Sequence, residues 1–221
     1  WSQRLTASAA ARTGELPLWQ DILGTEDPLL TSRPLTADDK VGSLASLTLS
    51  MPTTETLGND VLLASFAYAV GQWRRTQSAV VVMLEGHGRE EIEPGLDLTQ
   101  TLGWFTTRYP VRIDPGPSLD NALKAVKEQL ATIPDNGIGY GMLRYLNPGT
   151  AALAKLPEPQ ISFNHLGRLD NATHEGIGGG AHPDTPLPHA LIVNSYTDGT
   201  NLTATWSWPQ GLIPTDSVHA L

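Results

Sequence analysis

The chain of 221 residues contains no cysteine. This absence excludes disulfide scaffolds, thiolate metal sites and cysteine nucleophiles. Histidine is also scarce: the six histidines are scattered, and no two of them have the spacing of zinc ligands on a helix. We therefore expect no metal site.

Positive charge and long apolar runs are scarce as well. The 14 basic and 23 acidic residues give a formal net charge of -9, which repels phosphate backbones and anionic lipid. The longest apolar stretch, Ala79 to Leu84, is too short to cross a bilayer. The first residues do not form the basic and apolar leader of a secretory signal. We expect a cytoplasmic protein with no nucleic-acid or membrane partner.

Both ends of the sequence predict cuts through a longer polypeptide. The chain begins without an initiator Met, and Val218 to Leu221 read as the start of a helix. Hydrophobic residues make up 40% and charged residues 17% of the chain, as is typical of a folded globular domain.

Hydrophobic periodicity predicts a mixed sheet covered mainly on one face by helices, an α/β fold of the two-layer α+β type. We expect strands at 44–51, 79–84, 160–166, 189–196 and 202–208, and helices at 60–73 and 118–130. Residues 1–43 are expected to form lead-in helices, broken at Gly14 and Pro17, and a connector. Residues 44–221 are expected to form one lobe, with a mobile loop at 174–188.

Each expected helix has an apolar stripe. The first is predicted to bury Leu62, Phe66, Ala69 and Trp73, with Asp60 in its first turn or at its N-cap. The second is predicted to be capped by Ser118 and to bury Leu119, Leu123, Val126 and Leu130.

The segment Glu-Gly-His-Gly-Arg-Glu at 85–90 follows an apolar run rich in β-branched residues, which suits a strand buried on both faces. Its two glycines permit positive φ angles and the close approach of a ligand or another strand. A carboxylate at the end of such a strand is partly desolvated, which raises its pKa and allows proton exchange with a weakly acidic carbon. Arg89 would act in the opposite sense. A solvated turn that ends the strand is the alternative interpretation.

The segment 85–90 resembles a signature of epimerization domains from non-ribosomal peptide synthetases. Four further segments resemble signatures of that family in the family's order: Asn59 to Ala64, Thr101 to Pro110, Pro134 to Gly141 and Phe163 to Gly167. Any one of the five could arise by chance, but five in order make a specific match.

The resemblance implies a fold of two lobes similar to chloramphenicol acetyltransferase, with an active site between them. The family's first lobe carries a His-His-x-x-x-Asp-Gly motif, and this chain has no His-His pair. The resemblance therefore implies that the chain is the carboxy-terminal lobe, and that the amino-terminal lobe and the neighbouring synthetase domains are its missing partners.

The resemblance also implies a reaction, the inversion of the Cα of an aminoacyl or peptidyl thioester. The substrate is carried on the 4'-phosphopantetheine of a peptidyl carrier protein, and no cofactor is bound by the lobe itself. Glu85 is implied as one of two acid–base groups. The residues implied to line the substrate tunnel are His87, Arg89, Gln100, Tyr140, Asn164 and His165.

The chain departs from the family's pattern at two of these positions. Gln100 stands where the family usually carries Arg, and His165 where it usually carries Tyr. The join at 53–60 is also shorter than usual, through a deletion or through residues left out of the sequence. Two other functions stay open: a condensation domain lobe that forms an amide bond between carrier-bound groups, or a non-catalytic lobe that docks a carrier protein.

Structural roles are predicted for the other conspicuous side chains. Trp104 and Phe105 are expected to anchor the core. His87 is equally well explained as a turn residue satisfied by a backbone carbonyl, and the Gly-Tyr-Gly of 139–141 as a tight turn rather than a phosphate cradle.

Overall fold

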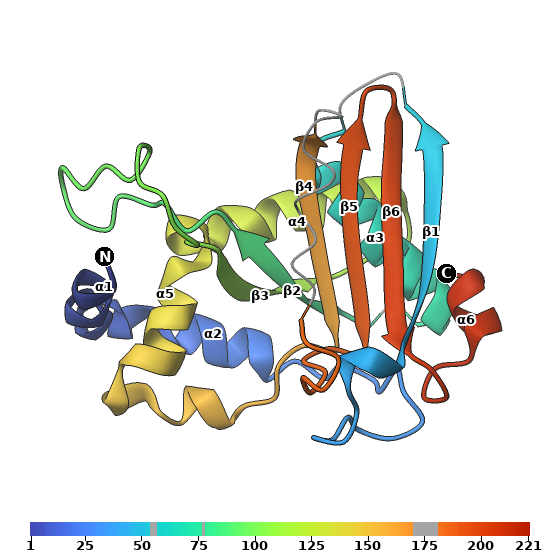
Figure 1. Ribbon diagram of the computed structural model, residues 1–221, viewed down its shortest axis with the longest axis horizontal. Helices are drawn as coiled ribbons and strands as arrows, with labels where there is room; N and C mark the ends of the chain where they lie inside the picture. The colour runs from blue at the N-terminus through green and yellow to red at the C-terminus, as the bar shows by residue number, and fades with distance from the viewer. Residues whose placement is uncertain (54–56, 77, 170–180) are drawn as a thin grey trace.

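The computed structural model describes residues 1–53, 57–76, 78–169 and 181–221, which form a single mixed sheet and its helices (Figure 1). The six strands are β1 Leu44–Pro52, β2 Val80–Gly86, β3 Thr107–Ile113, β4 Ile161–Leu169, β5 Leu191–Asp198 and β6 Asn201–Pro209. Their order in the sheet is β1-β6-β5-β4-β2-β3. Strand β4 runs parallel to both β2 and β5, whereas the remaining pairs are antiparallel. The five strands expected from the sequence are confirmed, and β3 is an additional one.

Helices cover the sheet unequally. They are α1 Ser2–Ser8, α2 Leu16–Leu23, α3 Asn59–Arg74, α4 Leu119–Thr132, α5 Ile138–Gly141 and α6 Thr215–His219, and a π-helical turn, η4, spans Met142–Leu146. Helices α3 and α4 lie behind the sheet in Figure 1, while α1, α2 and α5 lie beside its β3 edge. Within the described ranges, every helix falls short of the length and apolarity needed to cross a membrane. The α/β class and the mixed sheet predicted from the sequence are confirmed.

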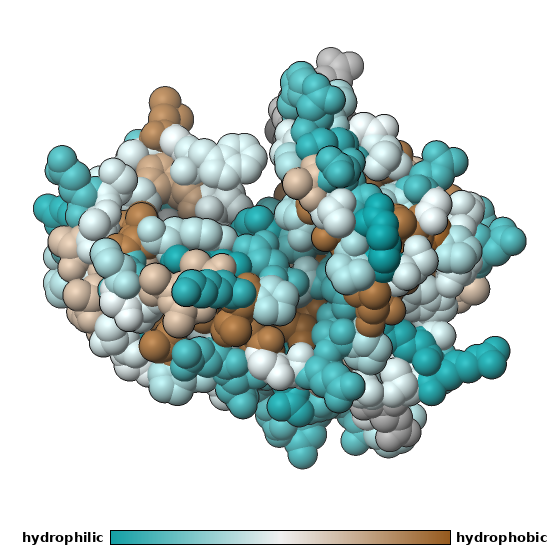
Figure 2. Space-filling model, turned by 90° about the horizontal axis from the view of Figure 1, so that it is seen from below, coloured by the Kyte–Doolittle hydropathy of each residue, from teal (hydrophilic) through white to brown (hydrophobic). Residues whose placement is uncertain are grey.

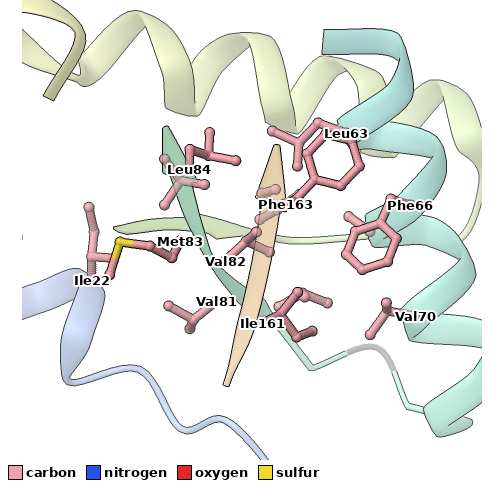
Figure 3. Close-up of a cluster of buried hydrophobic side chains, with 14 of the residues drawn as sticks. Ile22, Leu63, Phe66, Val70, Val81, Val82, Met83, Leu84, Ile161 and Phe163 are labelled. Carbon is pink, nitrogen blue, oxygen red and sulfur yellow. The ribbon is translucent and has the colours of Figure 1, made fainter. Parts of the chain in front are cut away.

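Strand β2 is buried on both of its faces. Its residues Val80 to Leu84 are all between 0 and 3% exposed. Met83 meets Ile22 of α2 on one face, as Figure 3 shows, and on the other face Phe163 of the neighbouring strand stacks with Phe66 of α3 at 5.3 Å. Each such side chain contributes roughly 1.5–3 kcal/mol through burial. The prediction of a strand buried on two sides is confirmed.

The lead-in segment belongs to the same core. The predicted break at Gly14 falls in a 3-10 segment, Ala9–Glu15, that separates α1 from α2. The predicted break at Pro17 is wrong, because Pro17 lies in the first turn of α2, where a proline is tolerated. Helix α2 then places Trp19, Ile22 and Leu23 in the main apolar cluster.

The buried stripe of α3 differs from the predicted one by about one residue. Its buried side chains include Leu63, Phe66, Ala67 and Val70, whereas Leu62, Ala69 and Trp73 are half-buried. Helix α4 packs against α3, so α3 is covered on a second side as well as by the sheet. A sequence pattern fitted to one face cannot anticipate that second contact.

Helix α4 is capped as predicted, because Ser118 Oγ accepts a hydrogen bond from the Asn121 amide at 3.3 Å. Its buried residues are Ala122 and Val126. The prediction that Leu119 is buried is wrong: this side chain is 45% exposed, because the first turn of the helix is left uncovered.

The segment between β2 and β3 projects from the sheet (Figure 1). It leaves Trp104 90% exposed, so the prediction that Trp104 anchors the core is wrong. Phe105, by contrast, is half-buried between Arg89, whose guanidinium lies 4.3 Å from the ring centroid, and Trp1. Adjacent side chains in an extended segment point in opposite directions, so only one of the two aromatic rings faces the body of the protein.

Two predicted connections are only partly within the described residues. The predicted loop at 174–188 lies outside them up to residue 180; the remainder has no helix or strand and makes an isolated bridge between Pro186 and Lys40. Residues 54–56 of the short join at 53–60 also lie outside them.

Gly88 has both features that were expected of a glycine in the 85–90 segment, a positive φ and a close backbone neighbour. Its φ is +66°, and a Cβ atom placed on it would lie 1.6 Å from the carbonyl oxygen of Phe105. No movement of a flexible side chain could relieve that overlap, because the oxygen belongs to the backbone.

We expect Gly88→Ala to lower the free energy of unfolding by about 3 kcal/mol, from left-handed strain together with the overlap. Gly95→Ala is the matched control, since Gly95 has a φ of +80° but nothing within 4 Å of its Cβ position. It should cost only about 1–2 kcal/mol. Urea unfolding measures both variants, and equal losses would show that the approach of Phe105 does not matter.

Candidate functional site

Three side chains stand in one row across neighbouring strands. Glu85 of β2 is paired directly with Arg108 of β3. On its other side, the parallel register of Leu84 with Phe163 places Glu85 beside Asn164. Phe163 faces α3, so the row lies on the opposite face of the sheet, which α3 and α4 do not cover.

Glu85 is a partly buried carboxylate held by one side-chain donor. Its Oε2 accepts a hydrogen bond from Asn164 Nδ2 at 3.0 Å, and the residue as a whole remains exposed to solvent. Partial burial of the group raises its pKa, in the direction expected from the sequence, and the nearby charge of Arg108 opposes that rise.

Arg108 is held on its far side by two groups. Its Nη2 contacts His189 Nε2 and lies 3.8 Å from Glu158 Oε2. Glu158 is itself fixed, because Tyr145 donates its hydroxyl hydrogen to Oε1 at 2.9 Å and Arg144 Nε lies 3.5 Å from the same oxygen. These contacts give the guanidinium of Arg108 a defined position at the β3 end of the row.

His189 is a neutral histidine. Its side chain is almost fully buried, and burial lowers its pKa to about 4. The carbonyl of Pro159 lies 2.7 Å from Nδ1 and fixes that nitrogen as the donor. Nε2 then carries the lone pair that accepts from Arg108.

A cavity of about 300 Å³ adjoins the row. Met83, Arg108, Tyr140 and Glu158 line it together with residues of α1, α5 and η4. In Figure 2 the surface is hollowed between the part that carries α1 and α5, on the left, and the part that carries the sheet, on the right. A ligand in this hollow would approach the β3 side of the row.

Tyr140 lies at the wall of this cavity. Its side chain is 1% exposed and packs edge-on against Trp19 at 5.4 Å. Burial raises the pKa of Tyr140, so the phenol is protonated at neutral pH. Among the described residues its hydroxyl has no hydrogen-bond partner.

Arg89 and His87 make their hydrogen bonds within the projecting segment and not with Glu85, Arg108 or Asn164. Arg89 donates to the carbonyl oxygens of Leu98 and Thr101, the latter at 2.8 Å. His87 lies in the turn and bonds to the backbone, but its partner is an amide and not the expected carbonyl: Nδ1 accepts a hydrogen bond from the Arg89 amide at 3.0 Å.

The two positions that depart from the family's pattern also lie apart from Glu85. Gln100 is an exposed residue of the projecting segment. His165 follows Asn164 in β4 and therefore faces the other side of the sheet, where it contacts Ser195 Oγ at 3.0 Å. Burial lowers the pKa of His165. The structure thus brings Glu85 and Asn164 together, with Tyr140 in the adjoining cavity.

Sequence reasoning missed Arg108, Glu158 and His189. A signal for Arg108 was present, because apolar Tyr109, Val111 and Ile113 alternate with Arg108 and Arg112 as in a strand. No local pattern marks Glu158 or His189, which lie 50 and 81 residues beyond Arg108 in the chain.

Comparison with known proteins decides the family. Residues 35–182 match the family described as Condensation domain. The chain belongs to the condensation-domain family. It is 35% identical over 254 residues to chondramide synthase cmdD of Chondromyces crocatus, covering 100% of this chain and 6% of that protein. It is 39% identical over 157 residues to surfactin synthase subunit 1 of Bacillus subtilis (strain 168), covering 66% of the chain and 4% of the relative.

Solved structures agree with the family. The epimerization domain from the third module of tyrocidine synthetase B is similar with a TM-score of 0.81 and 27% identity, over 100% of this chain and 55% of that one. The X-domain from teicoplanin biosynthesis is similar with a TM-score of 0.64 and 15% identity, over 99% of this chain and 54% of that one, a likeness of fold alone. This condensation-family chain spans about half the length of these structures and a few per cent of the curated relatives.

The buried His189 predicts an acid-sensitive stability. The unfolded chain binds a proton at His189 near the usual pKa of 6.5, whereas the folded chain binds it only near pH 4. The contribution is fully present above about pH 6.5 and is lost as the pH falls toward 4. We expect urea unfolding of His189→Gln to depend less steeply on pH than that of the unaltered protein over this window. Equal slopes would contradict a neutral His189.

Proposed function

We propose that this chain is one half of a peptide synthetase epimerization domain, which inverts the Cα of an aminoacyl or peptidyl thioester held on a carrier protein. The observation that carries the proposal is the position of Glu85, at the end of a buried strand and on the face of the sheet opposite α3 and α4. Its carboxylate is oriented by Asn164 at 3.0 Å and has a raised pKa.

Such a carboxylate suits proton transfer at carbon. In one direction the ionised carboxylate of Glu85 takes the Cα proton, and the electron pair of the broken C–H bond moves into the thioester carbonyl to form an enolate. A second acid, on the other half of the domain, returns a proton to the opposite face of Cα. A raised pKa strengthens the base, and partial exposure of the carboxylate leaves room for the substrate.

Asn164 is proposed to orient Glu85 without neutralising it. An amide donor holds one carboxylate oxygen and carries no net charge, so Oε1 remains available to the substrate proton. The likeness to the tyrocidine synthetase epimerization domain, at 27% identity over the whole chain, supports this reaction over amide formation.

We expect Glu85→Gln to lower Cα exchange by at least about 100-fold, because the amide cannot accept the proton. The assay loads a carrier protein with an L-aminoacyl or L-peptidyl thioester and adds the two-lobed domain in deuterated water. Deuterium at Cα and the stereochemistry of the product are then followed. Glu128→Gln, on the solvent side of α4 with 69% of its side chain exposed, is the control and should exchange normally.

Each rival function has its own outcome in this assay. Amide formation with a second loaded carrier, without Cα exchange, would replace epimerization by condensation. Binding of the carrier without either reaction would leave only a docking role.

We expect the isolated 221 residues to be inactive in the assay. Glu85 can serve only one face of Cα, and the proposal assigns the opposite face to the other half of the domain. Deuterium incorporation by the isolated chain at a rate comparable to that of the two-lobed domain would contradict this division.

A further inference from the structure

We propose that Arg108 is a positioning residue of this acid–base site: it holds a positive charge beside the Glu85 carboxylate, while Glu158 and His189 keep its guanidinium from closing onto that carboxylate. This inference rests on the proposed function of Glu85, and it concerns three residues to which the sequence pattern assigns no role.

The register of β2 and β3 carries the first step. Glu85 and Arg108 are direct cross-strand partners, and such partners have Cβ atoms about 4.5–5.5 Å apart on one face of the sheet. An Arg and a carboxylate that lie so close can form a two-pronged ion pair. Here both residues are described, and no hydrogen bond or ion pair joins them.

The second step is the set of contacts on the far side of Arg108. His189 Nε2 accepts from Nη2, and Glu158 Oε2 lies 3.8 Å from Nη2. His189 can accept at Nε2 only while it is neutral, a state that burial favours, and the Pro159 carbonyl holds the remaining proton on Nδ1. The guanidinium is thereby turned toward these two groups and leaves the Glu85 carboxylate to Asn164.

Glu158 is fixed in turn by a buried cation. Arg144 donates to the carbonyl oxygens of Leu153, at 2.7 Å, and Leu156, at 3.0 Å, and its Nε lies 3.5 Å from Glu158 Oε1. These bonds hold the segment that carries Glu158. The arrangement therefore alternates in charge, from Glu85 through Arg108 and Glu158 to Arg144.

The consequence is a carboxylate under two opposed influences. Burial favours the protonated form of Glu85, and Arg108 favours the ionised form without occupying the oxygen that must reach the substrate. Arg108 on β3 is the charged group that acts on Glu85, and Asn164 on β4 is a neutral donor. Glu158 and His189 contact Arg108, while Arg144 and Tyr145 contact Glu158. Tyr140 lines the adjoining cavity.

The test compares pH profiles of Cα exchange in the two-lobed domain. For the stereoisomer whose proton Glu85 removes, exchange falls at acid pH as Glu85 becomes protonated. Arg108→Met should move this acidic limb to higher pH, so that the rate on the limb, relative to the plateau, falls by about two- to five-fold. Arg108→Lys keeps the charge and should restore most of the native profile.

Two further variants make the test specific. Arg112→Met removes a cation four positions along the same face of β3, roughly 13 Å away, and should leave the limb where it is. Glu158→Gln removes a carboxylate that competes for Arg108, and should move the limb to lower pH. That opposite shift keeps the proposal testable if Arg108→Met does not fold.

A uniform loss of rate at every pH in Arg108→Met, with the limb unmoved, would overturn the proposal in favour of a purely structural Arg108. So would an equal shift in Arg112→Met. If the native domain shows no Cα exchange, the proposed function fails instead. The inference is then decided by NMR titration of the Glu85 carboxyl carbon, assigned from its absence in Glu85→Gln, which must titrate at higher pH in Arg108→Met.

Discussion

Strand β2 lies between two apolar layers, and the place where it leaves them determines the chemistry of the residue that follows. Val80 to Leu84 are enclosed by α3 on one face and by α2 on the other. The next residue, Glu85, remains within the strand and its hydrogen-bonded ladder but reaches the edge of the apolar region. Its backbone is thus rigid where its carboxylate is partly desolvated, a combination that a loop residue would not provide.

The register of three strands builds the rest of the site around that residue. A shift of one residue in β3 or β4 would turn Arg108 or Asn164 to the opposite face of the sheet. His165 illustrates the effect, because it is adjacent to Asn164 in sequence and contacts Ser195 on the far side. Along each strand, the apolar neighbours of these polar residues point to the other face. Phe163, next to Asn164, packs against α3 and so holds the register.

The sequence predicted what depends on local pattern. The β-branched run before Glu85 favours a strand buried on both faces, and the positive φ of Gly88 favours glycine there. The sequence-based predictions were wrong where packing against a distant segment determines which side chains are buried. Helix α4 shifts the buried stripe of α3, and the projection of the β2–β3 segment exposes Trp104. His189 could not be identified as a partner of Arg108, since only the completed sheet brings them together.

The pairing of β1 with β6 has a consequence for how the chain reaches this structure. Leu44 pairs with Pro209, so two segments that are far apart in the sequence lie side by side in the sheet. During synthesis, β1 emerges from the ribosome long before β6. Until β6 has emerged, the amide and carbonyl groups of β1 lack their partner strand. The order of synthesis therefore leaves β1 able to pair with a wrong strand until β6 has emerged. This risk exists only during folding, because β6 covers β1 in the folded sheet.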